Sequence, residues 1–399
     1  MERTKAIRNE IMCCMNCGDC RIAFRPAIER FKVCPIREIH PSAFEPFFSR
    51  GKMNLAKGLL RGDLKPNKEL ADIFYQCTSC GSCREVCHQS HNPYIQNNVC
   101  KYLDHIKVWE AVRADLVDAG YAPLPRHEEI TKWMEKEHNP YMEKHEDRIN
   151  WLEGKKLPEK AGVIFFMGCT EPYRIPELLK AIVKILEKAG VEFTILHPEE
   201  YCCGSVGFRV GMRKIAEELA KHNFETIKKS GAKTVMTHCA GCYRTLKEDY
   251  KDLFGELPFK VVHASEFILD LIKSGKLKLT KSIEKTVTYH DPCHLGRHTG
   301  LYEAPREILR SIPGLKLVEM ERHHQHAWCC GAGGGVKSQY PDLANKITDD
   351  RVEEAERTKA NILTTMCPFC GRSFKETIEA RKTFIEFKDV LELVIESME

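Results

Sequence analysis

The pattern of apolar and polar positions divides the chain into a helical first part and an alternating second part. Over the first 100 residues the apolar positions have helical spacing, interrupted by Pro26, Pro35, Pro41, Pro46 and Pro66. Residues 101–155 continue as an amphipathic helix and then a charged stretch, which we interpret as a connector packed on the surface. From about residue 160, short β-branched or aromatic runs alternate with amphipathic helices, which predicts βαβ units and parallel sheets.

The second part of the chain repeats itself. Each copy runs through a strand, a single cysteine, a helix, a strand, Cys-Cys-Gly, a helix, a strand and Cys-x2-Cys. The cysteines of the first copy are Cys169, Cys202, Cys203, Cys239 and Cys242, and those of the second are Cys293, Cys329, Cys330, Cys367 and Cys370. Their last members are 128 residues apart, a domain-sized period that indicates a duplication.

Composition restricts the class of protein. The chain has 399 residues, of which 43% are apolar and 30% charged, and its net charge is only +4. These values argue against disorder and against a dedicated nucleic-acid surface. The apolar runs are far shorter than the roughly 20 residues of a membrane span, and the polar N-terminus has no secretory apolar segment. We therefore expect a cytoplasmic protein that reaches a membrane only peripherally, through a partner subunit.

Twenty cysteines are the strongest chemical signal in the chain. Sixteen of them lie within four residues of another cysteine, close enough for two thiolates to bind one metal centre. Disulfide frameworks rarely have this spacing, and they are typical of short secreted domains. The cysteine pattern therefore indicates metal sites.

The N-terminal cysteines have ferredoxin-like spacing. The second run, Cys-x2-Cys-x2-Cys-x3-Cys, is typical of 4Fe-4S cubanes, whereas the first run has thirteen residues before its last cysteine. In such pairs the fourth cysteine of each run binds the other cluster. We therefore assign one cubane to Cys14, Cys17, Cys20 and Cys87, and the other to Cys34, Cys77, Cys80 and Cys83.

These assignments have alternatives. A structural zinc site also uses Cys-x2-Cys pairs, although three cysteines on consecutive two-residue spacers suit a cubane better. His88 occupies the position where proline is usual. Cys13 is interpreted as a bystander beside Cys14, a choice that spacing alone leaves open. Cys100 stands alone and is interpreted as a buried small side chain.

The five cysteines of each repeat lie at or just beyond the ends of predicted strands. Parallel strands bring such positions together at their carboxyl edge, where open α/β folds bind ligands. Gly204 and Gly331 follow the Cys-Cys pairs and let the backbone approach a bulky centre, so we count both as cofactor-binding residues. Five thiolates exceed the needs of one zinc ion and favour a centre with several irons.

The predicted fold is therefore an α+β multidomain protein. A helical ferredoxin-like domain with two 4Fe-4S cubanes occupies residues 1–120, and a connector occupies 121–159. Two repeated α/β domains with parallel sheets follow at 160–280 and 281–399. The two repeats are expected to be related by a pseudo-twofold axis, with the active centre between them.

These cysteine patterns and their order along the chain resemble those of a known family. Each five-cysteine pattern is similar to the complete form of the cysteine-rich CCG domain. A ferredoxin-like module followed by two CCG domains resembles the D subunit of heterodisulfide reductase, whose parts occur elsewhere as the separate C and B subunits. The segments HDPCH at 290–294 and NPYMEKHEDRINWL at 139–152 add to the resemblance.

The resemblance implies a noncubane 4Fe-4S cluster in each five-cysteine set, which makes all ten cysteines both metal ligands and catalytic residues. The implied reaction is reduction of the coenzyme M–coenzyme B heterodisulfide, or a similar disulfide, between the two clusters. Each cluster would deliver one electron. The cubanes would receive electrons from a partner, which is a membrane cytochrome b in the D-subunit family and a flavoprotein for the separate-chain relatives.

A second resemblance supports a different function. The same module order occurs in iron–sulfur subunits of flavin-dependent lactate, glycolate and glycerol-3-phosphate dehydrogenases, where such a chain relays electrons toward a quinone. Two complete five-cysteine sets favour the disulfide reductase, because a relay has less need of two centres able to bind substrate.

Four other side chains are weaker candidates. His290 and His294 flank Cys293 and are candidate proton donors to departing thiolates, although a hydrogen bond to a cluster sulfur is the commoner role. Arg209 and Arg297 are candidates for binding an anionic group of the substrate. The usual fate of a single arginine is solvation at the surface.

Overall fold

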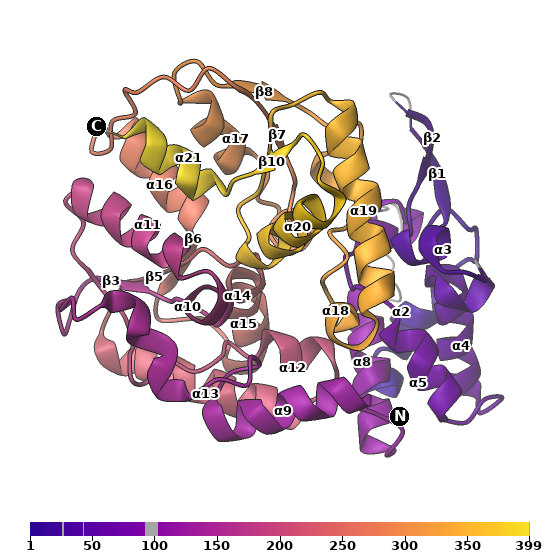
Figure 1. Cartoon of the computed structure of the whole chain (residues 1–399). Coiled ribbons are helices and arrows are strands. Elements are labelled where there is room, and N and C mark those ends of the chain that lie inside the picture. Colours follow the sequence, from indigo (N-terminus) through magenta and orange to yellow (C-terminus); the bar gives the residue numbers. More distant parts are fainter. Residues whose placement is uncertain (26–27, 43, 92–102, 399) are drawn as a thin grey trace. The chain divides into compact units, whose positions relative to one another are not determined.

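The computed structural model describes residues 1–25, 28–42, 44–91 and 103–398 (Figure 1). Cys100 lies outside the described residues. The chain forms two compact units, each assembled from three segments. Unit 1 contains Met1–Glu129, Val206–Arg213 and Glu321–Arg351, and unit 2 contains Ile130–Ser205, Lys214–Met320 and Val352–Glu399. The domain boundaries drawn from the sequence remain a prediction.

Unit 1 is mainly helical, as its apolar spacing predicts. Its first segment contains α1 (Glu2–Ala6), α2 (Arg8–Met12), α3 (Pro35–Ile39), η1 (Glu45–Phe47), α4 (Ser49–Arg61), α5 (Lys68–Tyr75), α6 (Ser82–Glu85), α7 (His88–His91) and α8 (His105–Asp118). Its later segments contain η4 (His324–His326), α18 (Val336–Gln339), most of α12 (Ser205–Arg209) and the first part of α19 (Pro341–Arg357). Helix α9 (Pro125–Glu137) begins in unit 1 and ends in unit 2.

Helices α4, α5 and α8 pack around one apolar core in unit 1. Phe74 of α5 and Trp109 of α8 are buried there, with ring centroids 5.8 Å apart. Asn67 caps α5 by accepting a hydrogen bond from a backbone amide of its first turn, and Asp104 caps α8 in the same way. These caps satisfy amides that the helices leave unpaired, so they fix where both helices begin.

A short antiparallel hairpin interrupts the helical part. Strands β1 (Ile22–Arg25) and β2 (Ile28–Lys32) occupy most of the thirteen residues between Cys20 and Cys34. The amide of Val33 donates a hydrogen bond to the carbonyl of Arg21 at 3.2 Å, so the chain returns close to the point where it left. The hairpin explains how a long spacer brings Cys34 back to the cysteine-rich segment.

Unit 2 contains two parallel sheets of four strands each (Figure 1). The strands of the first are β3 (Val163–Phe165), β4 (Phe193–Thr194), β5 (Thr234–Thr237) and β6 (Lys260–His263). Those of the second are β7 (Thr286–Tyr289), β8 (Lys316–Val318), β9 (Ile362–Thr364) and β10 (Glu386–Phe387). Within each repeat the spatial order is second, first, third, fourth. The predicted parallel sheets and their duplication are therefore confirmed.

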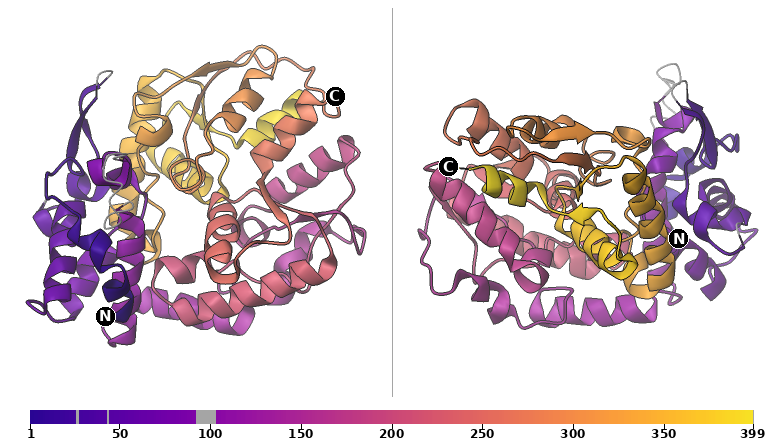
Figure 2. Two further views of the ribbon diagram at one scale, coloured as in Figure 1. Left: turned by 180° about the vertical axis from the view of Figure 1, so that it is seen from behind. Right: turned by 45° about the horizontal axis from the view of Figure 1, so that its top comes forward.

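Two pairs of helices in unit 2 pack across the boundary between the repeats. The helices of this unit are η2 (His145–Leu152), α10 (Thr170–Arg174), α11 (Pro176–Lys188), α13 (Arg213–Ser230), α14 (Ala240–Arg244), η3 (Thr245–Asp249), α15 (Tyr250–Phe254), α16 (Ala264–Lys273), α17 (Glu303–Arg310), α20 (Pro368–Arg381) and α21 (Val390–Ser397). Helix α11 packs against α21, and α16 packs against α17 (Figures 1 and 2). Because α11 and α17 follow the first strand of their repeats, and α16 and α21 the fourth, the two contacts are equivalent. Two equivalent contacts of this kind are what a pseudo-twofold relation between the repeats requires.

No helix among the described residues combines the length and the apolar character that crossing a bilayer demands.

Arg113 of α8 joins all three segments of unit 1. Its side chain is fully buried and donates hydrogen bonds to the carbonyl oxygens of Phe74 at 2.7 Å and Cys77 at 2.6 Å. It also donates to the carbonyls of Arg209 at 2.7 Å and Gly334 at 3.1 Å, one from each of the later segments. A buried guanidinium needs hydrogen-bond acceptors, and the buried carbonyls in turn need a donor, which Arg113 provides.

We predict that Arg113→Met destabilises the protein by about 3 kcal/mol or more, because it leaves several buried carbonyls without a donor. Anaerobic denaturant unfolding followed by circular dichroism measures the change. Arg61→Met, at the exposed end of α4, is the matched control and should stay within about 0.5 kcal/mol of the wild type. Equal stability of the two variants would contradict the role assigned to Arg113.

Candidate metal centres

The N-terminal cysteines gather in two cavities of unit 1. The lining of the first cavity includes Cys14, Cys17, Cys20 and Cys87. The lining of the second includes Cys34, Cys77, Cys80 and Cys83. These are the two groups that cross-ligation predicts, although ligation itself remains a prediction. Cys17 is exposed, so the first cavity reaches the surface of unit 1.

The second cavity is the more apolar of the two. Phe48, Ile106 and Trp109 contribute to its lining, and burial raises the pKa of Cys34 to about 12. The buried ammonium group of Lys52 also lines this cavity and donates a hydrogen bond to the carbonyl of Phe47 at 2.7 Å. A cation in an apolar cavity favours the anionic form of nearby sulfur.

Within unit 1, the Cys-Cys pair of the second repeat lies against the loop that carries Cys77 and Cys80. The thiol of Cys329 donates a hydrogen bond to Oγ1 of Thr78 at 3.4 Å, and its side chain also contacts Cys80. Gly334 makes the close approach possible, because a Cβ at this position would clash with the carbonyl oxygen of Cys77. Its φ of +63° also disfavours any other residue.

All five cysteines of the first repeat come together in unit 2. Cys169 follows β3, Cys202 and Cys203 follow β4, and Cys239 and Cys242 follow β5. Side-chain contacts join them in the order 169, 202, 203, 242, 239. Hydrogen bonds from Cys202 and Cys242 lower the pKa of Cys203 below that of an ordinary thiol. The carboxyl edge of the sheet therefore carries the five-thiol site that the spacing predicts.

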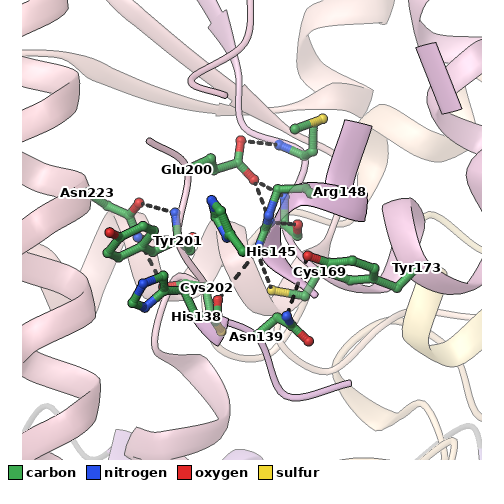
Figure 3. Close-up of polar contacts among 12 residues, drawn as sticks. His138, Asn139, His145, Arg148, Cys169, Tyr173, Glu200, Tyr201, Cys202 and Asn223 are labelled. Atoms are coloured by element: carbon green, nitrogen blue, oxygen red, sulfur yellow. Dashed lines mark hydrogen bonds and ion pairs between the residues drawn. The ribbon is translucent and has the colours of Figure 1, made fainter. Parts of the chain in front are cut away.

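The loop before this site is held by hydrogen bonds to its backbone. The buried side chain of Asn223 accepts from the amide of Tyr201 at 2.9 Å and donates to the carbonyl of Cys202 at 3.0 Å (Figure 3). Tyr250 donates to the carbonyl of Cys203 at 3.3 Å. Gly204 ends the loop with a φ of +90°, a conformation that suits glycine.

The second five-cysteine set is divided between the units. Cys293, Cys367 and Cys370 belong to unit 2, whereas Cys329 and Cys330 belong to unit 1. Gly331 follows the pair with a φ of +82°, and a Cβ at this position would clash with the carbonyl oxygen of Ala344. Within unit 2, the thiol of Cys239 contacts Cys367, so members of the two sets adjoin.

A buried arginine lies beside the first set. Nη2 of Arg148 donates a hydrogen bond to Sγ of Cys169 at 3.6 Å, and Nη1 lies 3.2 Å from a carboxylate oxygen of Glu200 (Figure 3). The side chains of Arg148 and Glu200 have no exposed surface. Burial by itself lowers the pKa of Arg148, but Cys169 and Glu200 outweigh it and the pKa is raised. Arg148 lies in the stretch that we interpreted as a surface connector, so that interpretation is wrong here.

An ion triad joins the two repeats at their cysteine-bearing edges. Nδ1 of His238 lies 3.0 Å from Glu171, and Nε2 lies 3.3 Å from Asp389 of the second repeat. All three side chains are buried. Burial by itself lowers the pKa of His238, but the two carboxylates raise it to about 10. The imidazolium is therefore held between two carboxylates, directly before Cys239.

The remaining candidates have different surroundings. His290 is buried, and one of its ring nitrogens lies within 4.8 Å of Sγ of Cys370. His294 lies near the first set, because a Cβ on Gly241 would be 3.8 Å from its Nδ1. Arg209 is buried in unit 1 with its Nε 2.7 Å from Glu110, so it is neither solvated nor free to bind a substrate anion.

Comparison with known proteins identifies these modules. Residues 163–247 and 287–375 match the cysteine-rich CCG domain, and residues 10–91 match a 4Fe-4S dicluster domain. The D subunit of dihydromethanophenazine:CoB–CoM heterodisulfide reductase from Methanosarcina mazei is 45% identical over 336 residues, which cover 83% of this chain and 79% of that protein. The protein of the same name from Methanosarcina barkeri is 40% identical over 409 residues, which cover 98% and 94%.

The chain belongs to the family of heterodisulfide reductase D subunits. It is thus an iron–sulfur oxidoreductase, as the cysteine pattern indicates. The family also has more distant relatives with other names. The B subunit of fumarate reductase (CoM/CoB) from Methanothermobacter marburgensis is 36% identical over 313 residues, which cover 77% of this chain and 58% of that protein.

The donor groups of this member of the heterodisulfide reductase family fit iron–sulfur clusters. All eighteen cysteines of the four sets are free thiols, so none is withdrawn into a disulfide. Each N-terminal cavity offers four thiols, the number that a 4Fe-4S cluster uses. Thiolate sulfur is a soft ligand that selects such clusters over magnesium or calcium.

We predict that Asp389→Asn destabilises the protein by about 3 kcal/mol, because it leaves the imidazolium of His238 with one carboxylate in a buried site. Asparagine can still cap α21, so the loss of stability measures the effect of removing the negative charge. Anaerobic denaturant unfolding measures it. The control is Glu392→Gln in the same capping box, for which we expect less than about 1 kcal/mol. Similar losses in both variants would show that capping, and not the triad, stabilises this region.

Proposed function

We propose that this protein is the catalytic subunit of a heterodisulfide reductase that reduces the mixed disulfide of coenzyme M and coenzyme B. The observation that carries the proposal is the complete five-thiol site of the first repeat, with Cys239 in contact with Cys367 of the second set. Similarity to a heterodisulfide reductase D subunit over 98% of the chain supports the substrate class.

The four sets would hold four 4Fe-4S clusters. Cys14, Cys17, Cys20 and Cys87 would hold one cubane, and Cys34, Cys77, Cys80 and Cys83 the other. The two repeats would hold noncubane clusters through their five cysteines each. Such clusters, when bound, supply one-electron transfers, so two of them divide the two-electron cleavage of a disulfide.

The residues around the cysteines serve this reaction in three ways. Burial of both Cys-Cys pairs excludes water from the sulfur atoms, and the contact of Cys329 with Thr78 and Cys80 provides a short route from a cubane ligand to a ligand of the second repeat. Cleavage also consumes two protons, because two electrons and two protons convert one disulfide into two thiols. His290 and His294 are the candidate donors of these protons.

The electron donor would be a separate redox subunit. For a chain of the D-subunit family we propose a membrane cytochrome b, which would place this chain at the membrane surface without a span of its own. Because Cys17 is exposed, the first cubane cavity would be the side of unit 1 at which electrons enter.

The test is anaerobic. We predict about sixteen irons per chain, four for each 4Fe-4S cluster, with matching acid-labile sulfide. A new paramagnetic signal should appear when coenzyme M thiol is added under oxidising conditions. About eight irons, or a full complement without a response to thiol, would overturn the reductase and leave an electron relay to a quinone.

Two cysteine variants locate the signal. Cys169→Ser, in the first repeat, should weaken or abolish the thiol-dependent signal while the cubane signals remain. Cys17→Ser, at the exposed N-terminal cavity, should lower the cubane signal and leave the thiol-dependent one. The reverse result would contradict the assignment of substrate chemistry to the repeats.

A further inference from the structure

The two repeats share a fold, but the charged groups beside their cysteines differ. In the first repeat the guanidinium of Arg148 contacts Sγ of Cys169 at 3.6 Å. The same group donates hydrogen bonds to the carbonyls of Gly168 and His138, and the His138 carbonyl also accepts from the amide of Cys202 at 2.9 Å. Arg148 therefore links the loops that carry two of the five cysteines.

The carboxylate of Glu200 offsets this charge at the sulfur only in part. Its oxygens accept hydrogen bonds from the amides of Met167 at 3.0 Å and Gly168 at 2.9 Å, in addition to the contact with Arg148. The negative charge is thus shared with two backbone amides, whereas Nη2 of Arg148 is directed at Cys169 (Figure 3).

The second repeat has a different charged group at the corresponding loop. Asp291 lies two residues before Cys293, where the first repeat has Met167 before Cys169. Arg306 donates to both oxygens of Asp291, at 2.6 and 2.9 Å, and its Nε donates to Glu319 at 2.7 Å. Two carboxylates therefore face one guanidinium. The residue that corresponds to Glu200, two before the Cys-Cys pair, is Ala327.

We propose that Arg148 is a positioning residue that raises the reduction potential of the first five-cysteine site. The inference rests on the proposed function, since it requires a cluster at that site. One-electron reduction adds one negative charge to a cluster and transfers no proton to it. A buried cation in contact with a ligand sulfur stabilises the reduced form more than the oxidised form, because the attraction grows with the negative charge.

The experiment is a redox titration of the full chain with all clusters assembled anaerobically. Dithionite and mediators set the potential, and EPR follows each cluster. A Cys370→Ser background, which lacks the second site, identifies the signal of the first site. Iron and acid-labile sulfide are measured on every variant, so loss of a cluster is distinguished from a change in its potential.

Arg148→Gln should lower the midpoint potential of the first site by at least the ~59 mV that corresponds to a tenfold change in a one-electron equilibrium. Arg148→Lys, which keeps the charge, should lie between glutamine and wild type. Arg306→Gln, the matched change in the second repeat, should leave the first-site potential unchanged. A purely structural role for Arg148 would alter cluster content and leave the potential of the remaining clusters unaltered.

Glu200→Gln provides a second test if Arg148→Gln fails to assemble. It removes the negative partner and keeps the guanidinium, so the first-site potential should rise. A full cluster content with unchanged potentials in these variants would overturn this inference and leave the proposed function intact. About eight irons per wild-type chain, as in a protein with cubanes only, would overturn both.

Discussion

The contact between His238 and its two carboxylates is the interaction on which the geometry of unit 2 depends. Glu171 belongs to α10, the helix after the first strand of one repeat, and Asp389 caps the last helix of the other. A buried imidazolium is tolerated only when it is paired, so the two repeats must meet at this point. Since Cys239 follows His238 directly and contacts Cys367, the same contact brings the cysteine-bearing edges together.

Much of this architecture could be predicted from the sequence because its signals are local. Cys-x2-Cys spacings constrain two thiols to one loop, and the alternation of short apolar runs with amphipathic helices specifies βαβ units. The duplication gives a second, independent indication of the same fold, because the order Cys169, Cys202-Cys203, Cys239 recurs from Cys293 onward. The equivalent strand orders of the two sheets follow from that repetition.

Other features have no local signal. The spacing of apolar residues does not predict the hairpin between Cys20 and Cys34, because its strands are only four and five residues long. Arg148 meets Cys169 and Glu200 across 21 and 52 residues of chain, and no periodicity relates these positions. The division of the chain into two units of three segments each likewise depends on long-range packing, such as the hydrogen bonds of Arg113.

The segment at residues 121–159, before the first repeat, makes the surroundings of the two five-cysteine sets different. A duplicated pair of sites starts with similar ligands, and similar sites have similar affinities for electrons and substrate. The segment that precedes the first repeat adds Arg148 beside Cys169, while the second repeat has Asp291 and Glu319 around Arg306. Cys329 of the second set also contacts Thr78, in the loop between Cys77 and Cys80. One set thus has a cysteine beside the loop of Cys77 and Cys80, and the other has a buried cation at Cys169, so the two sets have different surroundings. Under the function proposed above, such a difference would give the two sites different affinities for electrons.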